Sequence, residues 1–155
     1  MSDYDVRRAE LGEVRALRLG LLHPGGTLED VTNPGDELPG ALHVAGYRDD
    51  VPVAMGSIHP APMPGAHRTG AWRLREVAVE YGHRGRGLAS MVVERCIEHA
   101  SNEGGRICWA IVPAGAFGFA SRYGFRRHGD PIAGDAGPHY LAYTGLVPMD
   151  RSWSL

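Results

Sequence analysis

The feature of the sequence that most constrains its fold is a change of pattern within residues 74–100. The first part alternates and carries β-branched residues, which predicts a strand. The last part repeats apolar side chains at helical spacing, namely Leu88, Met91, Val92, Cys96 and Ala100. Three glycines and two arginines lie between the two parts, within residues 82–87. The pattern therefore predicts a strand, a glycine-rich turn and a helix in direct succession.

A turn of this kind is suited to bind a phosphate group. Gly85 and Gly87 allow the backbone to come close to a ligand, and the first turn of the helix offers unpaired N–H groups. These donors and the positive end of the helix dipole favour an anion. Arg84 and Arg86 add positive charge at the same place. We expect a site for a phosphate-bearing cofactor, with an ordinary tight turn and solvated arginines as the alternative.

Two well-known phosphate-binding patterns do not fit this turn. The Walker pattern needs Gly-Lys-Ser/Thr, and the turn has no lysine. The dinucleotide pattern needs a glycine where Ser90 stands, and an acidic residue after the next strand. That strand, predicted at residues 107–112, is followed by Pro113. Neither a Walker-type nor a dinucleotide-binding site is therefore expected.

A third pattern does fit. Residues 84–89, Arg-Gly-Arg-Gly-Leu-Ala, resemble the Arg/Gln-x-x-Gly-x-Gly/Ala signature of the GNAT superfamily of acetyl-CoA-dependent N-acyltransferases. Residues 77–79, Val-Ala-Val, resemble the family's fourth strand, whose backbone pairs with pantetheine. Ala116-x-x-Phe119 and Tyr123-Gly124-Phe125 resemble its fourth helix and the entry into its sixth strand. The order of elements resembles the family's along nearly the whole chain.

The resemblance implies an α/β fold in one domain over residues 1–155. Its GNAT-like sheet would be mixed, mostly antiparallel, with six to seven strands, flanked by helices, and with strands 4 and 5 splayed apart. It also implies acetyl-CoA as cosubstrate, a small-molecule or peptide amine as acceptor, and a possible homodimer. The residues expected to bind the cofactor are Val77, Ala78, Val79, Arg84, Gly85, Arg86, Gly87, Leu88, Ala89 and Phe119.

Composition limits the other possible classes. The 155 residues are 43% hydrophobic and 22% charged, as in a soluble globular domain, and the net charge of −2 gives no reason to expect nucleic acid. No apolar run approaches the roughly 20 residues of a membrane span, and the first residues do not form a signal-peptide pattern. We expect a cytoplasmic protein in which Cys96 and Cys108 are core thiols. The histidines show no metal-ligand spacing, so no metal is expected.

Periodicity places the remaining elements. Strands are predicted at residues 4–8, 42–47, 51–59, 72–79, 106–112, 125–128 and 140–147, and helices at 10–22, 88–103 and 114–123. Residues 23–40 read as an acidic loop, which in the resembling family holds a second helix or a variable loop. We interpret Glu29, Asp30, Asp36 and Glu37 there as solvated, with attraction of a cationic acceptor as the alternative.

Acetyl transfer to an amine needs a group that removes a proton from the ammonium. Glu76 is a candidate base if its side chain faces the cleft, and pairing with Arg73 or Arg75 is the alternative. His139 and Tyr140 are further catalytic candidates, because residues 137–139 resemble a stretch that lines the acceptor pocket in one GNAT subgroup. His43 and His59 are weaker candidates, each more often structural.

The helix at residues 114–123 departs from the family pattern. Ala120 stands where much of the family has a tyrosine placed to protonate the leaving thiolate, and Tyr123 takes a core position. Ser121, Tyr140 or Tyr143 could replace that tyrosine. The sequence therefore predicts an N-acetyltransferase acting by direct attack in a ternary complex, with a weakly catalytic or non-catalytic acyl-CoA-binding module as the alternative.

Overall fold

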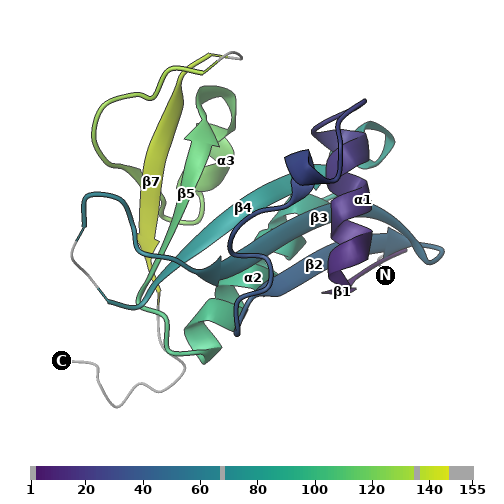
Figure 1. The fold of residues 1–155 in the computed structure, drawn as a ribbon, viewed down its shortest axis with the longest axis horizontal. Helices are drawn as coiled ribbons and strands as arrows, with labels where there is room; N and C mark the ends of the chain where they lie inside the picture. Colours follow the sequence, from purple (N-terminus) through teal and green to yellow (C-terminus); the bar gives the residue numbers. More distant parts are fainter. Residues whose placement is uncertain (1–2, 67–68, 135–136, 147–155) are drawn as a thin grey trace.

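A computed structural model describes residues 3–66, 69–134 and 137–146. Seven strands form one sheet in the order β1-β2-β3-β4-β5-β7-β6 (Figure 1). The strands are β1 (Tyr4–Arg8), β2 (Leu42–Arg48), β3 (Val51–Pro60), β4 (Ala71–Val79), β5 (Ile107–Pro113), β6 (Arg126–Arg127) and β7 (His139–Gly145). The helices are α1 (Leu11–Leu21), α2 (Leu88–Asn102) and α3 (Phe117–Ser121), with short 3₁₀ turns η1 (Glu29–Val31), η2 (Tyr81–His83) and η3 (Ala114–Ala116).

The sheet is mixed and mostly antiparallel, as predicted. Of its strand pairs only β4 and β5 run parallel, and they pair only from Ala71 opposite Ile107 to Arg73 opposite Trp109. Both strands continue beyond this short ladder without pairing with each other, and Figure 1 shows them diverging. The predicted splay of these two strands is confirmed.

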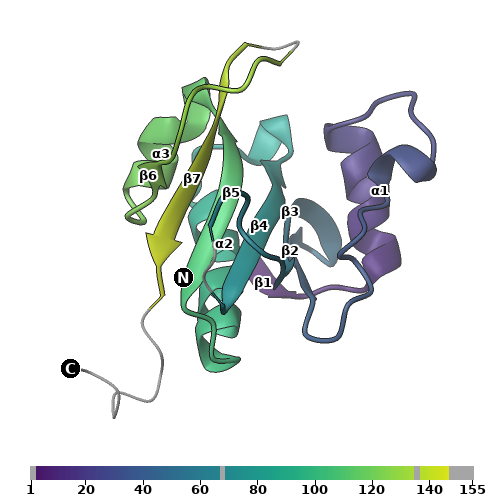
Figure 2. The same ribbon diagram turned by 60° about the vertical axis from the view of Figure 1, so that its left-hand side comes forward.

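Helices cover the two faces of the sheet (Figure 2). Of the apolar side chains of α2 predicted from helical spacing, Leu88, Val92, Cys96 and Ala100 are buried in the largest core, and Met91 is partly buried against it. Val14 of α1 packs on the opposite face with Ala45 and Met55. Amphipathic helices bury their apolar stripe in this way, so each face of the sheet has its own core.

Several boundaries differ from the sequence expectation. The helix predicted at residues 114–123 is a 3₁₀ turn followed by the short helix α3, and the strand predicted at 125–128 is reduced to the two residues of β6. Residues 23–40 contain only the 3₁₀ turn η1. Val147, the predicted end of the last strand, lies outside the described residues. None of the helices in the described part of the chain is long and apolar enough to cross a membrane.

Candidate active site

The divergence of β4 and β5 opens a cleft of about 910 Å³. Its walls come from β4 and from the end of β5, and the glycine-rich turn, the start of α2 and helix α3 close it. Nine of the ten residues predicted to bind the cofactor line this cleft: Val77, Ala78, Val79, Arg84, Gly85, Gly87, Leu88, Ala89 and Phe119. Arg86 is exposed and does not line it.

The glycine-rich turn has the geometry of an anion-binding site. Gly85 and Gly87 adopt φ of 76° and 79°, and Gly87 is the N-cap of α2. Only glycine reaches this region without strain. Among the residues that the structure describes, none accepts a hydrogen bond from the backbone N–H groups of residues 85–90. A diphosphate would satisfy such donors, so the residues present fit the predicted cofactor.

The backbone of β4 offers further donors to the cleft. The N–H of Glu80 donates to the carbonyl of Val53 on β3 at 2.8 Å. Because successive N–H groups of a strand point to opposite sides, those of Val77 and Val79 point away from β3, toward the side where β5 has diverged. The Val79 carbonyl on that side accepts a hydrogen bond from Arg84 Nε at 3.2 Å. This bond ties the turn to the end of the strand.

Glu76 occupies an irregular position in β4. Its φ is 61°, a left-handed conformation that costs a non-glycine residue about 1–2 kcal/mol, and the register with β3 shifts between Met55 and Ser57. This β-bulge lies directly before the cleft-facing backbone of Val77. Glu76 lines the cleft, and its Oε1 lies 3.4 Å from Asn33 Nδ2 and 3.9 Å from Arg75 Nε. Glu76 thus lines the cleft, as a base would have to, and its carboxylate is also near Arg75, as in the alternative interpretation.

The other two catalytic candidates lie in different places. His139, the first residue of β7, lines the same cleft as Glu76. The structure does not bring Tyr140 to the cleft: its ring packs edge-on against Phe117 of α3, and the Arg127 guanidinium stacks on it at 4.0 Å. Successive residues of a strand face opposite sides of a sheet, which explains why these two neighbours separate.

Ala120 of helix α3 and Tyr123, which follows the helix, lie in the cleft wall. Ala120, at the position of the family tyrosine, is 8% exposed. Tyr123 is partly buried and packs against the main core, as expected, and it also lines the cleft. Ser121 is exposed and donates to the Gly118 carbonyl, and Tyr143 does not line the cleft.

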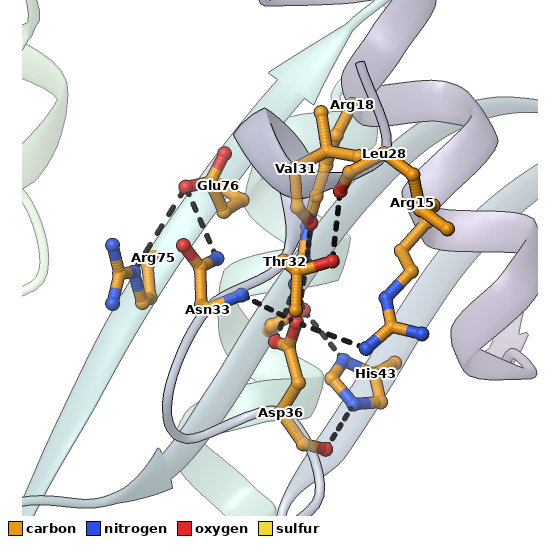
Figure 3. A network of polar contacts seen from close by, with 11 residues as sticks. Arg15, Arg18, Leu28, Val31, Thr32, Asn33, Asp36, His43, Arg75 and Glu76 are labelled. Atoms are coloured by element: carbon orange, nitrogen blue, oxygen red, sulfur yellow. Dashed lines mark hydrogen bonds and ion pairs between the residues drawn. The ribbon is translucent and has the colours of Figure 1, made fainter.

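A buried polar network joins α1 to the loop above the cleft (Figure 3). Arg18 is fully buried and donates two hydrogen bonds to the Asp36 carboxylate, at 2.8 and 3.0 Å. It donates two more to the Val31 carbonyl and to Ser57 Oγ. The prediction that Asp36 is solvated is wrong, because the Arg18 guanidinium draws the carboxylate into the interior. Glu29, Asp30 and Glu37 are exposed, as expected.

The network also fixes His43 and the turn that holds Asn33. His43 Nε2 lies 3.0 Å from the Asp36 carbonyl, which only accepts, so Nε2 carries the proton and Nδ1 accepts from Ser57 Oγ at 2.8 Å. The Asn33 N–H donates to Asp36 Oδ2 at 2.9 Å. Burial raises the cost of charge on Asp36, but the bonds from Arg18 and Asn33 outweigh it and lower the pKa of the carboxyl. Asn33, and with it Glu76, is thus held by a residue on α1.

Burial also keeps His43 and His59 neutral. It is the main cause that lowers the pKa of each imidazole, and the charges of Arg75 and Arg73 lower the pKa of His59 further. Neither histidine lines the cleft, which fits the structural role considered for both. Among the described residues, no group of three His, Cys, Asp or Glu side chains is arranged to hold a metal ion.

Comparison with known proteins shows the family. The sequence matches the family model described as the acetyltransferase (GNAT) family over residues 22–125. The chain belongs to the GNAT family. Membership makes it an acyl-CoA N-acyltransferase with an amine acceptor. A search of curated proteins by sequence gave no significant match.

Solved GNAT structures share the fold. The chain is similar to Escherichia coli ElaA, with 15% identity, a TM-score of 0.73, and coverage of 92% of this chain and 99% of the other. An acyl-CoA N-acyltransferase from Pseudomonas aeruginosa is 19% identical with a TM-score of 0.71, covering 90% and 97%. An aminoglycoside 6'-N-acetyltransferase in complex with coenzyme A is 15% identical with a TM-score of 0.70, covering 94% and 99%. At these identities the likeness shows the GNAT fold alone.

Proposed function

We propose that this GNAT protein transfers an acetyl group from acetyl-CoA to a primary amine by direct attack within a ternary complex. One observation carries the proposal: a single cleft joins the unpaired N–H groups of the glycine-rich turn to the carboxylate of Glu76. The first is suited to a diphosphate and the second to an ammonium. Holding both reactants in one cleft contributes about 7–11 kcal/mol of barrier lowering in well-oriented systems.

The cofactor end of the cleft is assigned to the turn and to β4. The backbone of residues 85–90 binds the diphosphate, with Arg84 beside it. Acetyl-CoA, when bound, supplies the activated acyl group. The cleft-facing N–H groups of Val77 and Val79 pair with its arm, and one of them donates to the oxygen that becomes negative during acyl transfer. Phe119 covers this part of the cleft from α3.

The acceptor end is assigned to Glu76. An amine is mostly an ammonium at pH 7, so its proton must leave before the nitrogen attacks. Glu76 Oε1 takes that proton, directly or through one water, while Asn33 and Arg75 hold the carboxylate in place. Cys96 and Cys108 take no part. Both are buried, and burial raises the pKa of Cys108 to about 12, so neither supplies a thiolate for a covalent acyl-enzyme.

The leaving thiolate has no obvious proton donor. Ala120 has no proton to give, and Tyr123, which follows α3, is the one tyrosine among the described residues that lines the cleft. We assign protonation of the thiolate to Tyr123 or to water. The observation of Ala120 in the cleft wall also favours a second candidate function, an acyl-CoA-binding module with little or no turnover.

A free-thiol assay over an amine panel separates the two functions. An enzyme releases CoA thiol above the hydrolytic background with at least one amine, whereas a binding module releases none. Glu76→Gln should lower kcat/KM by about 10²–10⁴-fold at neutral pH, the usual contribution of a general base. Glu80→Gln is the matched control, because Glu80 is exposed beyond the end of β4 and does not line the cleft. Equal rates for the two variants would remove Glu76 from the mechanism.

A further inference from the structure

Building on the proposed function, we propose that the acceptor carries a carboxylate close to its amine, as an α-amino acid does, and that Arg73 and Arg75 bind this carboxylate. Both arginines line the cleft, and both precede Glu76 on β4. Trp72 and Leu74 are buried in the core under α2. By strand alternation Arg73 and Arg75 therefore face the other side of the sheet, where α1 and the loop after it lie.

In the described part of the chain, neither guanidinium group has a hydrogen-bond acceptor. The Arg73 guanidinium lies over the Trp109 ring at 4.8 Å and makes no hydrogen bond or ion pair with any described residue. The Arg75 guanidinium lies 3.9 Å from the Glu76 carboxylate, and no described residue accepts a hydrogen bond from it. The Nε atoms of both are inaccessible to solvent and have no partner within the described chain. Burial lowers the pKa of both guanidinium groups. Donors without acceptors are costly in a buried setting. Both side chains are only partly buried and line the cleft, so a ligand there can accept hydrogen bonds from the guanidinium nitrogens that remain accessible.

The two arginines lie too far from the glycine-rich turn to bind the phosphates of the cofactor. A strand rises about 3.3 Å per residue, so Arg73 lies roughly 20 Å from Val79, where the glycine-rich turn begins. Arg75 is roughly 13 Å from the same point. The diphosphate has its own donors in residues 85–90. The anion that Arg73 and Arg75 bind belongs to the acceptor end of the cleft.

The charges on this side of the sheet favour an anionic group in the acceptor. Arg15, Arg18, Arg73 and Arg75 gather on this side of the sheet with two carboxylates, Asp36 and Glu76. Arg18 and Arg15 form ion pairs with Asp36, so Glu76 is the carboxylate that remains for Arg73 and Arg75. These two guanidinium groups and one carboxylate leave an excess of positive charge, which a carboxylate of the acceptor offsets, and a planar carboxylate matches the planar donor edge of a guanidinium.

Geometry then limits the distance between amine and carboxylate in the acceptor. Glu76, the proposed base, and Arg75 are adjacent residues whose side chains approach to 3.9 Å (Figure 3). An amine placed at Glu76 therefore has its carboxylate partner within a few bonds, as in an α-amino acid. A long diamine or a peptide N-terminus places no carboxylate there.

The experiment compares free L-amino acids with their amides in the free-thiol assay. A charge-assisted hydrogen bond contributes enough to predict that the best free acid exceeds its amide by about 10–100-fold in kcat/KM. Arg73→Gln and Arg75→Gln should each reduce this preference to below about threefold, mainly by raising KM for the acid. Arg95→Gln, a change at an exposed position of α2, should keep the preference. Circular dichroism and thermal denaturation establish that each variant is folded.

A second measurement does not depend on turnover. In ¹⁵N-labelled protein saturated with CoA, N-acetyl-L-amino acids should shift the Nε–H signals of Arg73 and Arg75, and the corresponding N-acetyl amides should not. Equal use of acids and amides would overturn this inference and leave the acetyltransferase proposal standing. Failure of every amine in the panel to raise thiol release above the hydrolytic background would overturn the acetyltransferase proposal. Arginine signals unmoved by every N-acetyl-amino acid would overturn the inference whatever the turnover.

Discussion

Replacing Asp36 by asparagine tests the central structural claim, that α1 holds the loop above the cleft through a buried ion pair. The side chains of Arg18 and Asp36 are 1% and 2% exposed, so no solvent compensates the charge that remains. Removing one partner of such a pair costs about 3–5 kcal/mol of unfolding free energy.

The contacts give the same magnitude. Asp36 accepts two hydrogen bonds from Arg18 and one from the Asn33 N–H. An asparagine side chain offers one oxygen, and its NH₂ group faces a guanidinium that only donates. At least one charge-assisted bond is lost, at about 1.5–3 kcal/mol, and the uncompensated charge of Arg18 adds to this. We therefore expect Asp36→Asn to lower the unfolding free energy by about 3–5 kcal/mol.

Urea denaturation followed by circular dichroism measures this loss. Glu37→Gln is the matched control, because the neighbouring residue is exposed and loses the same charge, so its change should stay within about 0.5 kcal/mol. The double variant Arg18→Met/Asp36→Leu removes both charges. Its loss of unfolding free energy should be smaller, by at least ~2 kcal/mol, than the sum of the losses in the single variants Arg18→Met and Asp36→Leu.

Equal effects of Asp36→Asn and Glu37→Gln would refute the reasoning. They would mean that the carboxylate is solvated, as the sequence alone suggested. Additive effects of the two single changes would equally show that Arg18 and Asp36 act independently.

Three further predictions concern the turn, the bulge and the buried histidines. Gly87→Val should abolish CoA binding in calorimetry with the fold retained, because Gly87 has a φ of 79° and lies where the ligand must approach. Gly82 has no positive φ, so the control variant Gly82→Val should bind CoA more tightly than Gly87→Val does. An unchanged CoA affinity of Gly87→Val would contradict the proposed cofactor site. The unfolding free energy of Glu76→Gly, measured in urea, should exceed that of Glu76→Ala by about 1 kcal/mol, because only glycine adopts the left-handed backbone conformation without strain. The reverse order would rule out strain at this position. Burial lowers the pKa of His43 and His59 in the folded state, so the unfolded chain binds protons first as the pH falls below about 6.5. The unfolding free energy should therefore decrease from pH 7.5 to pH 5.5. A urea midpoint that does not change over this pH range would contradict the prediction.

Local patterns made most of the fold predictable. The helical spacing of apolar residues in α2 and the glycines before it predict the helix strongly, because the same apolar residues that show the spacing pack into the core. The splay of β4 and β5 is not visible in either strand's own sequence. It came from the resemblance to the GNAT family, and the short ladder ending at Arg73 and Trp109 confirms it.

The network around Arg18 shows where sequence reasoning stopped. Arg18 lies on the same helical face as Leu11, Val14 and Leu21, so an arginine at a core position was a signal for a buried partner. Its partner Asp36 lies 18 residues away in an acidic loop. No local pattern distinguishes this carboxylate from its solvated neighbours, because pairing across such a loop depends on the tertiary fold.

The bulge at Glu76 connects the shape of the sheet to the proposed chemistry. A regular β4 would place residue 76 on the face opposite Arg75, in the core under α2, where a carboxylate is costly. The left-handed backbone at Glu76 keeps its side chain near Arg75 and Asn33, and it lies just beyond the point where β4 leaves β5. In the proposed mechanism, this distortion turns the carboxylate toward the acceptor, and the divergence of β5 leaves the N–H groups of Val77 and Val79 for the cofactor. Because Asn33 is tied through Asp36 to Arg18, the strain at Glu76 is sustained by a buried ion pair outside the cleft.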